Sequence, residues 1–214
     1  MWQKYIFFLP GLFLVMLFWG CQTVTVDSDG QVIPKNVMTK EERTKSDIEL
    51  LVDALAIPNN LKINKICEKL IKYKESAIPE LSRNIDNRIP SVRLFSIYCL
   101  GQIYTKTKSK AILQLKDQLY QRLSDRLMRI RLEAAAALCA IQDYRGVPIL
   151  IEGLRSRSSY VRMNAYQVLR QTFTLVFSYH YYEKNEKIRE KSVKQWENWW
   201  EKNKGKYLNK TVHA

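Results

Sequence analysis

Side chains able to do acid–base, metal or nucleophilic chemistry are scarce in this sequence. It has two histidines: His180 lies within the aromatic run from Tyr179 to Tyr182, and His213 is the penultimate residue. No His–Glu pair is repeated, as a di-metal site on helical repeats would require. The motifs GxSxG, GxGxxG and the P-loop are all missing from the 214 residues. The sequence therefore predicts no catalytic residue, no metal site and no cofactor.

Arginine is the one residue type with a chemically suggestive pattern. Three groups follow one another along the chain: Arg83 and Arg88; Arg122, Arg126 and Arg129; and Arg155 and Arg157. Guanidinium groups bind phosphate or carboxylate in a bidentate manner, and the net charge of +14 favours anionic partners. The groups predict an anion-binding edge if their turns lie together. The alternative is a set of solvated turns in which Asp86 and Asp125 offset part of the charge.

Repeated helices carry these arginines. The chain is 46% hydrophobic but has only 7 glycines and 6 prolines, which favours an all-helical fold over a sheet. The dipeptides Val92-Arg93, Ile130-Arg131 and Val161-Arg162 align. Four residues after each branched residue comes a small one, and eight after it comes a leucine: Ser96, Ala134 and Ala165, then Leu100, Leu138 and Leu169. One helical face therefore occurs three times.

A shorter helix precedes each of these faces. Residues 77–81 and 146–150 correspond, and each has a proline where a helix begins. In the middle unit, Ile112 precedes the aligned Ile130 by four residues more than the corresponding spacing in the other two units. This difference predicts about one extra helical turn. Residues 48–71 form a degenerate fourth unit. The sequence thus predicts an all-α superhelix of about four helical hairpins.

The aligned units resemble the HEAT-like repeat, the kind also found in phycobilisome lyases. Residues 131–138 and 146–154 match that pattern best, and the similarity covers about residues 46–173. The resemblance implies a solenoid whose surfaces bind other molecules. It also implies that Arg93, Arg131 and Arg162 form a structural ladder at the turns between repeats.

The C-terminal part, residues 174–214, contains a tryptophan-rich stripe. Trp196, Trp199 and Trp200 share one face of an expected helix over about 186–203. Together with Arg189, the stripe resembles a segment that follows HEAT-like repeats in some bacterial proteins. It predicts a cap over the last repeat, since a terminal unit must cover its apolar face. An aromatic surface for a partner is the alternative.

The N-terminus has the pattern of an export signal. A charged start precedes an apolar run over 6–19, which ends at Gly20-Cys21. Residues 1–20 resemble a bacterial lipoprotein signal, which implies a lipid on Cys21, although Phe18 and Trp19 depart from the usual pattern. An ordinary cleaved signal and an uncleaved anchor are alternatives, but the apolar run is shorter than the roughly 20 residues that a spanning helix needs. Residues 21–45 are polar and are predicted to be a flexible tether.

The three other cysteines are Cys67, Cys99 and Cys139. Their number is odd and no CxxC motif occurs, so neither a disulfide framework nor a zinc site is predicted. Each stands among apolar residues in a helical pattern. We therefore expect them to be small buried hydrophobic residues.

These patterns together predict a lipid-anchored protein of the bacterial cell envelope, with the outer membrane suggested by Gln22 after Cys21. Its expected role is that of a non-catalytic scaffold or adaptor that binds a protein or an anionic envelope component. An enzyme or a lyase-type accessory subunit is the alternative, which a convergent pocket with a perturbed acid or base would favour. Nucleic acid is a less suitable partner, because the turns lack interleaved aromatic residues and the signal directs export.

Overall fold

The computed structural model describes residues 25–26, 32–33, 38–57, 60–174 and 177–211. The chain divides into two units, residues 1–39 and 40–214. The expected signal over residues 1–20 and the expected lipidation site Cys21 lie outside the described residues. In the first unit, β1 (Thr25–Val26) pairs with β2 (Val32–Ile33) in an antiparallel manner. Among the helices described, none combines the length and hydropathy needed to span a membrane.

In the second unit, the described residues between 40 and 211 form only helices and the turns that join them, which confirms the predicted all-α fold class at that level. Its elements are α1 (Lys40–Ala54), α2 (Asn60–Lys72), η1 (Lys74–Ala77), α3 (Ile78–Arg83), α4 (Pro90–Thr107), α5 (Lys110–Leu113), α6 (Lys116–Gln121), η2 (Arg122–Ser124), α7 (Met128–Ala140), η3 (Tyr144–Gly146), α8 (Val147–Gly153), α9 (Ser159–Thr172) and α10 (Glu186–Thr211).

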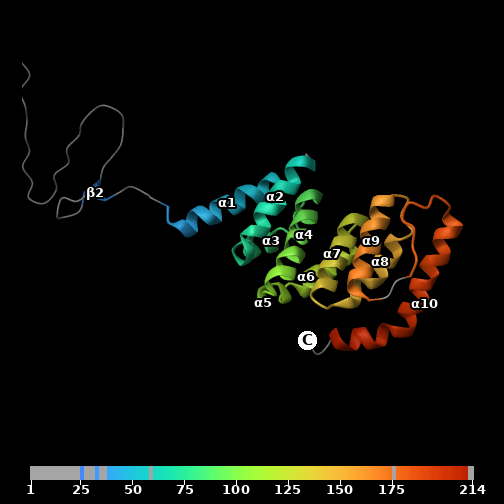
Figure 1. Cartoon of the computed structure of the whole chain (residues 1–214). Helices are drawn as coiled ribbons and strands as arrows, with labels where there is room; N and C mark the ends of the chain where they lie inside the picture. The colour runs from blue at the N-terminus through green and yellow to red at the C-terminus, as the bar shows by residue number, and fades with distance from the viewer. Residues whose placement is uncertain (1–24, 27–31, 34–37, 58–59, 175–176, 212–214) are drawn as a thin grey trace, which may run out of the picture. The chain divides into compact units, whose positions relative to one another are not determined.

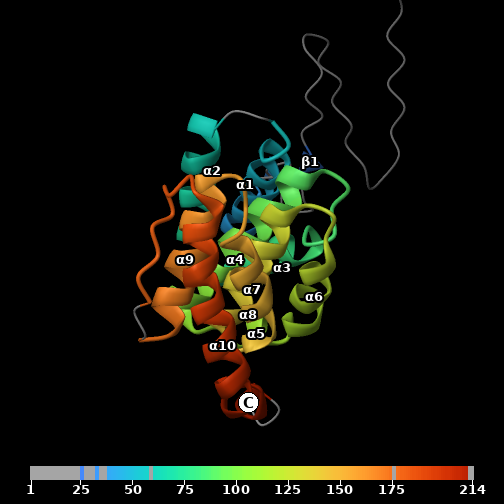
Figure 2. The same cartoon turned by 90° about the vertical axis from the view of Figure 1, so that its right-hand side faces the viewer.

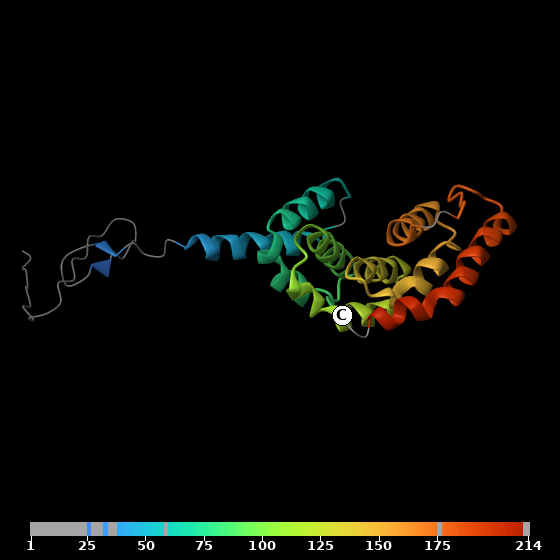
Figure 3. The ribbon, with the colours of Figure 1, turned by 60° about the horizontal axis from the view of Figure 1, so that its bottom comes forward.

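The helices form antiparallel pairs that follow one another along the chain (Figure 1). The pairs are α1 with α2, α3 with α4, α6 with α7, and α8 with α9. The second helices of the pairs also pack on one another in order, α2 on α4, α4 on α7, and α7 on α9. In Figure 3, α4 and α7 lie in the middle of this row, with α2 and α9 on either side.

The recurring face predicted from the sequence forms the core between these helices. The small residues Ser96, Ala134 and Ala165 are buried, and the leucines at the eighth position are fully buried. Small side chains also allow close approach between elements. A Cβ atom added to Gly146 would lie 2.7 Å from the Cα of Ala135 on α7, so this position requires glycine.

Three boundaries differ from those predicted. Helix α1 begins at Lys40, inside the expected tether, because Glu41 and Glu42 are helix formers that favour the first turn. The extra residues of the middle unit do not add a turn to one helix but separate α5 from α6. Helix α10 continues past 203 to Thr211, because Tyr207 and Leu208 extend its apolar stripe onto the core.

Helix α10 covers the end of the array by packing on α8 and η3 (Figure 2). Trp196 and Trp200 are buried against Phe173, and Trp199 lies in a T-shaped contact with the same ring, 4.7 Å between centroids. Trp196 also contacts Phe177, at 4.9 Å. The three predicted capping tryptophans thus meet around the residue that follows α9.

Candidate functional site: a polar groove and an arginine-lined edge

A groove of about 690 Å³ runs along the second helices of the hairpins. Residues of α2, α4, α7 and α9 line it, so it crosses the row of helices seen in Figure 3. Gly101, Ala136 and Ala140 form its middle part on α4 and α7. These small residues take up little of the space between the two helices.

Amide side chains are the commonest polar groups in the groove. The structure shows no hydrogen bond from these side chains to any described residue: Asn64, Gln102, Gln142, Asn164, Gln167 and Gln171. Each carries two N–H donors and an acceptor oxygen. The groove therefore offers unused donors and acceptors along its length, which match the alternating N–H and C=O groups of a polypeptide backbone.

Glu133 and Arg129 are the two charged residues among the described residues that line the groove. Glu133 is half-buried on α7. Burial raises the pKa of its carboxyl to about 7, although the positive charge of Arg129 opposes the shift. The guanidinium of Arg129 lies over the ring of Tyr160, 5.8 Å from its centroid. The Glu133 carboxyl can therefore gain or lose its proton near neutral pH.

This carboxyl bears on the enzyme alternative. A perturbed acid in a pocket is one feature of a catalytic site. No histidine, aspartate or lysine converges on Glu133 among the described residues that line the groove. His180 lies exposed between α9 and α10, away from that lining. The geometry thus supplies one proton-exchanging group in an open groove.

The seven predicted edge arginines do not form one free ridge. Arg83 is paired with Glu80, and Arg122 lies 3.2 Å from Asp86. Arg155 forms bidentate hydrogen bonds with both Glu190 and Glu197 of α10, which lower the pKa of each carboxyl. With Arg129 over Tyr160, four of the seven have an intramolecular partner. The other three side chains are exposed and make no ion pair within the described part of the chain: Arg88, Arg126 and Arg157.

The predicted ladder arginines occupy one structural position. Arg93, Arg131 and Arg162 are each the fourth residue of their helix, and each Nη1 donates to the carbonyl six residues earlier, at 2.8, 3.1 and 2.7 Å. Arg189, the fourth residue of α10, does the same with Glu183 at 2.9 Å. Alignment of the repeats did not include this fourth member, because its helix belongs to the cap, although Ile188-Arg189 has the same form as Ile130-Arg131 and could have identified it.

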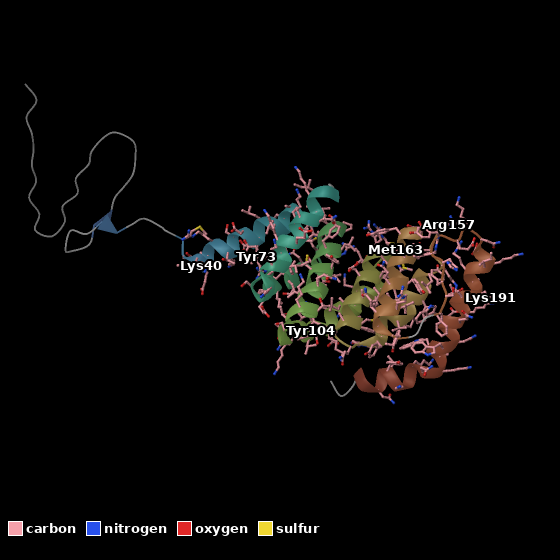
Figure 4. All side chains as sticks on the ribbon, viewed as in Figure 1. Lys40, Tyr73, Tyr104, Arg157, Met163 and Lys191 are labelled. Carbon is pink, nitrogen blue, oxygen red and sulfur yellow. The ribbon has the colours of Figure 1, made fainter. Side chains whose placement is uncertain are left out.

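The exposed cations lie at a fixed distance in sequence from the ladder arginines. Five residues before the four ladder arginines stand Arg88, Arg126, Arg157 and Lys184, all of them exposed. Figure 4 shows Arg157 at the edge of the array where the turn enters α9. One cation per turn therefore remains available at this edge.

Side-chain contacts also join neighbouring turns. Arg93 reaches forward to Asp125, and Arg131 reaches Glu152 at 3.1 Å. Arg162 donates to the carbonyl oxygen of Tyr181 at 2.9 Å. These three ladder arginines thus tie their own turns to the next hairpin or to the segment that leads into α10.

All three described cysteines are buried, as expected. Although they are 32 residues apart in the sequence, Cys67 on α2 and Cys99 on α4 lie close enough that each thiol shifts the pKa of the other. The neighbouring Cys67 side chain, together with burial, raises the pKa of the Cys99 thiol. Across the described residues no group of histidine, cysteine, aspartate and glutamate side chains could hold a metal ion.

No protein-family model matches the chain, and no curated protein matches its sequence.

Proposed function

We propose that this protein is a lipid-anchored, non-catalytic adaptor of the bacterial cell envelope. In this proposal the helical pairs form a HEAT-like solenoid, and the groove holds a polypeptide segment of a partner protein. The observation that carries it is the set of unpaired amide side chains on successive helices of the groove. The lipid anchor rests on the N-terminal pattern that ends at Cys21.

A polypeptide suits the groove better than a small ligand does. Amides spaced over α2, α4 and α9 can exchange hydrogen bonds with backbone groups along an extended segment. Small residues in the middle of the groove let a backbone approach closely. A small polar ligand would meet only a few of these groups, and the others would stay hydrogen-bonded to water and add nothing to its affinity.

The test is a selection of random 12-residue peptides displayed on phage, with the full chain in detergent as bait. We expect the selected peptides to bind the Ala111→Trp variant as they bind the unmodified chain, because Ala111 is exposed on α5 outside the groove. The Ala136→Trp variant places the same indole inside the groove. Its affinity should fall at least about tenfold. Equal binding by both variants, or failure to select any peptide, would contradict the proposal.

The lipid anchor has its own test. Intact mass of the protein from its native host should show loss of residues 1–20 and a gain of acyl chains. Both changes should disappear in a Cys21→Ser variant, which would partition into the aqueous phase of a detergent extraction. An uncut chain without acyl groups would refute the anchor and leave the groove proposal untouched.

The row of exposed cations favours a second binding role at the edge of the array. Arg88, Arg126, Arg157 and Lys184 recur in one register and can contact anionic lipid headgroups. Co-sedimentation of the Cys21→Ser chain with vesicles containing phosphatidylglycerol tests this role. Charge reversal of the three arginines to glutamate should abolish sedimentation at low salt, whereas Lys106→Glu on α4 should not. Vesicle binding that persists at high salt would contradict binding through the charges of this edge.

A further inference from the structure

We infer that Glu133 selects the occupant of the groove, and that the bound segment places a lysine or arginine side chain on this carboxylate between Tyr98 and Tyr160. This inference rests on the proposed function and names the chemistry of the partner segment.

The Glu133 carboxylate is short of partners in the isolated protein. It makes no hydrogen bond or ion pair with any described residue, although it is half-buried. Arg129 stands one helical turn earlier on the same face, but its guanidinium is over the ring of Tyr160. A carboxylate that has lost much of its water and has no close ion pair gains strongly from a charged donor.

The surroundings of Glu133 fit a cation on an alkyl chain. Tyr98 comes from α4 and Tyr160, which is 54% exposed, from α9, and both aromatic rings line the same groove as the carboxylate. Ring faces attract cations, and the methylene groups of lysine or arginine pack on apolar surface such as Ala136. An anionic side chain at this place would meet like charge from Glu133 and would be rejected.

Affinity for such a side chain should depend on pH. The groups that face Glu133 are Arg129 on its own helix, Cys67 on α2, Tyr98 and Cys99 on α4, and Tyr160 on α9. Because burial raises the pKa of Glu133 to about 7, the carboxylate is the minority form at pH 6 and the majority form at pH 8. Binding of a cation requires the carboxylate, so affinity should rise with pH across this window.

Peptides from the phage selection provide the probes. We expect them to share a lysine or arginine at one position, and replacement of that residue by norleucine or citrulline should weaken binding. Glu133→Gln keeps the shape of the side chain and removes its charge, and it should lower affinity at least about tenfold. Glu68→Gln on α2 is the matched control, because Glu68 is exposed and does not line the groove. It should leave affinity unchanged.

The pH dependence separates a charge effect from a change of shape. For the unmodified chain, affinity should fall about tenfold from pH 8 to pH 6, and Glu133→Gln should abolish this dependence. A carboxyl ¹³C NMR titration of Glu133 should show its pKa fall when the peptide binds.

The possible outcomes separate failure of the Glu133 inference from failure of the adaptor proposal. Groove-dependent peptides without a common basic residue, or affinity that ignores Glu133→Gln, would overturn the inference while the adaptor proposal stood. Failure to select any groove-dependent peptide would overturn both.

Discussion

Arg93 on α4 donates two hydrogen bonds to Asp125, from Nε to Oδ2 at 3.0 Å and from Nη2 to Oδ1 at 3.3 Å. The residues are 32 positions apart, and Asp125 stands in the turn before α7. Its Oδ1 also accepts the backbone N–H of Leu127 at 3.0 Å. This one carboxylate therefore shapes its own turn and fixes the position of the preceding hairpin beside it.

Removing the charge of Asp125 should destabilise the fold more than removing an exposed ion pair. Only 4% of the Asp125 side chain is exposed, so Asp125→Asn leaves Arg93 without its counter-charge and should lower the free energy of unfolding by about 3 kcal/mol. Asp86→Asn is the control, because the Asp86 side chain is 52% exposed beside Arg122 and should contribute about 1 kcal/mol at most. Urea unfolding measures both. Equal effects would contradict a special role for Asp125.

Lowering the pH should remove the stabilisation that the Asp125 carboxylate provides. Burial alone would raise the pKa of Asp125, but hydrogen bonds from Leu127 and Arg93 hold it below the usual 3.8. The stabilisation is therefore complete above about pH 5 and is lost as pH falls through the unfolded pKa towards the folded one. Asp125→Asn should show a correspondingly smaller loss of stability below pH 4.

The repeat pattern predicted the helices and the ladder positions because both depend on local spacing. The face from Val92 to Leu100 is periodic, and its recurrence places each arginine on the fourth residue of a helix. The state of the edge arginines could not be predicted in this way. Arg155 is paired with Glu190 and Glu197, which stand 35 and 42 residues away on the capping helix. Packing of α10, not sequence spacing, decides which cations remain available.

The environment of Glu133 in the groove was likewise not predictable from local sequence spacing. In the sequence it follows Arg131-Leu132 within an alanine-rich helix and has the pattern of a solvated charge. Its altered pKa comes from burial among groove residues of α2, α4 and α9, which no local pattern records. The sequence did contain one indication of the groove, because Asn164, Gln167 and Gln171 of α9 share a polar face opposite the core.

The aromatic cap should contribute heavily to stability. Trp196 is fully buried between Phe173 and Phe177, so Trp196→Ala should cost about 3 to 5 kcal/mol and expose the end of the array. Tyr182→Ala is the control, because Tyr182 is 71% exposed in the preceding turn. Thermal unfolding of both variants measures the difference. A small effect of Trp196→Ala would instead favour a partner surface.

The neighbouring thiols of Cys67 and Cys99 should form a disulfide under oxidising conditions. Treatment with diamide should take two hydrogen atoms from the pair, forming one S–S bond while diamide is reduced to its hydrazine. The bond would close a loop between α2 and α4 and should raise stability by about 3 kcal/mol. Mass spectrometry after alkylation measures it. Cys139→Ser should still form the bond, and Cys67→Ser should not. Alkylation of both Cys67 and Cys99 after oxidation of the unmodified chain would refute the pairing.

The protonation of Glu133 should govern stability near neutral pH. Burial raises its pKa from 4.5 to about 7, so between these values the folded state holds a proton that the unfolded chain has released. Stability must therefore fall as pH rises through this window, by up to about 3 kcal/mol. Glu133→Gln stays neutral, and it should match the unmodified chain at pH 4 but exceed its stability at pH 8. Glu68→Gln should follow the unmodified chain at both values. Parallel pH profiles for the unmodified chain and Glu133→Gln would show that the carboxyl is well solvated, whereas divergence would show a stability cost that a bound cation could relieve.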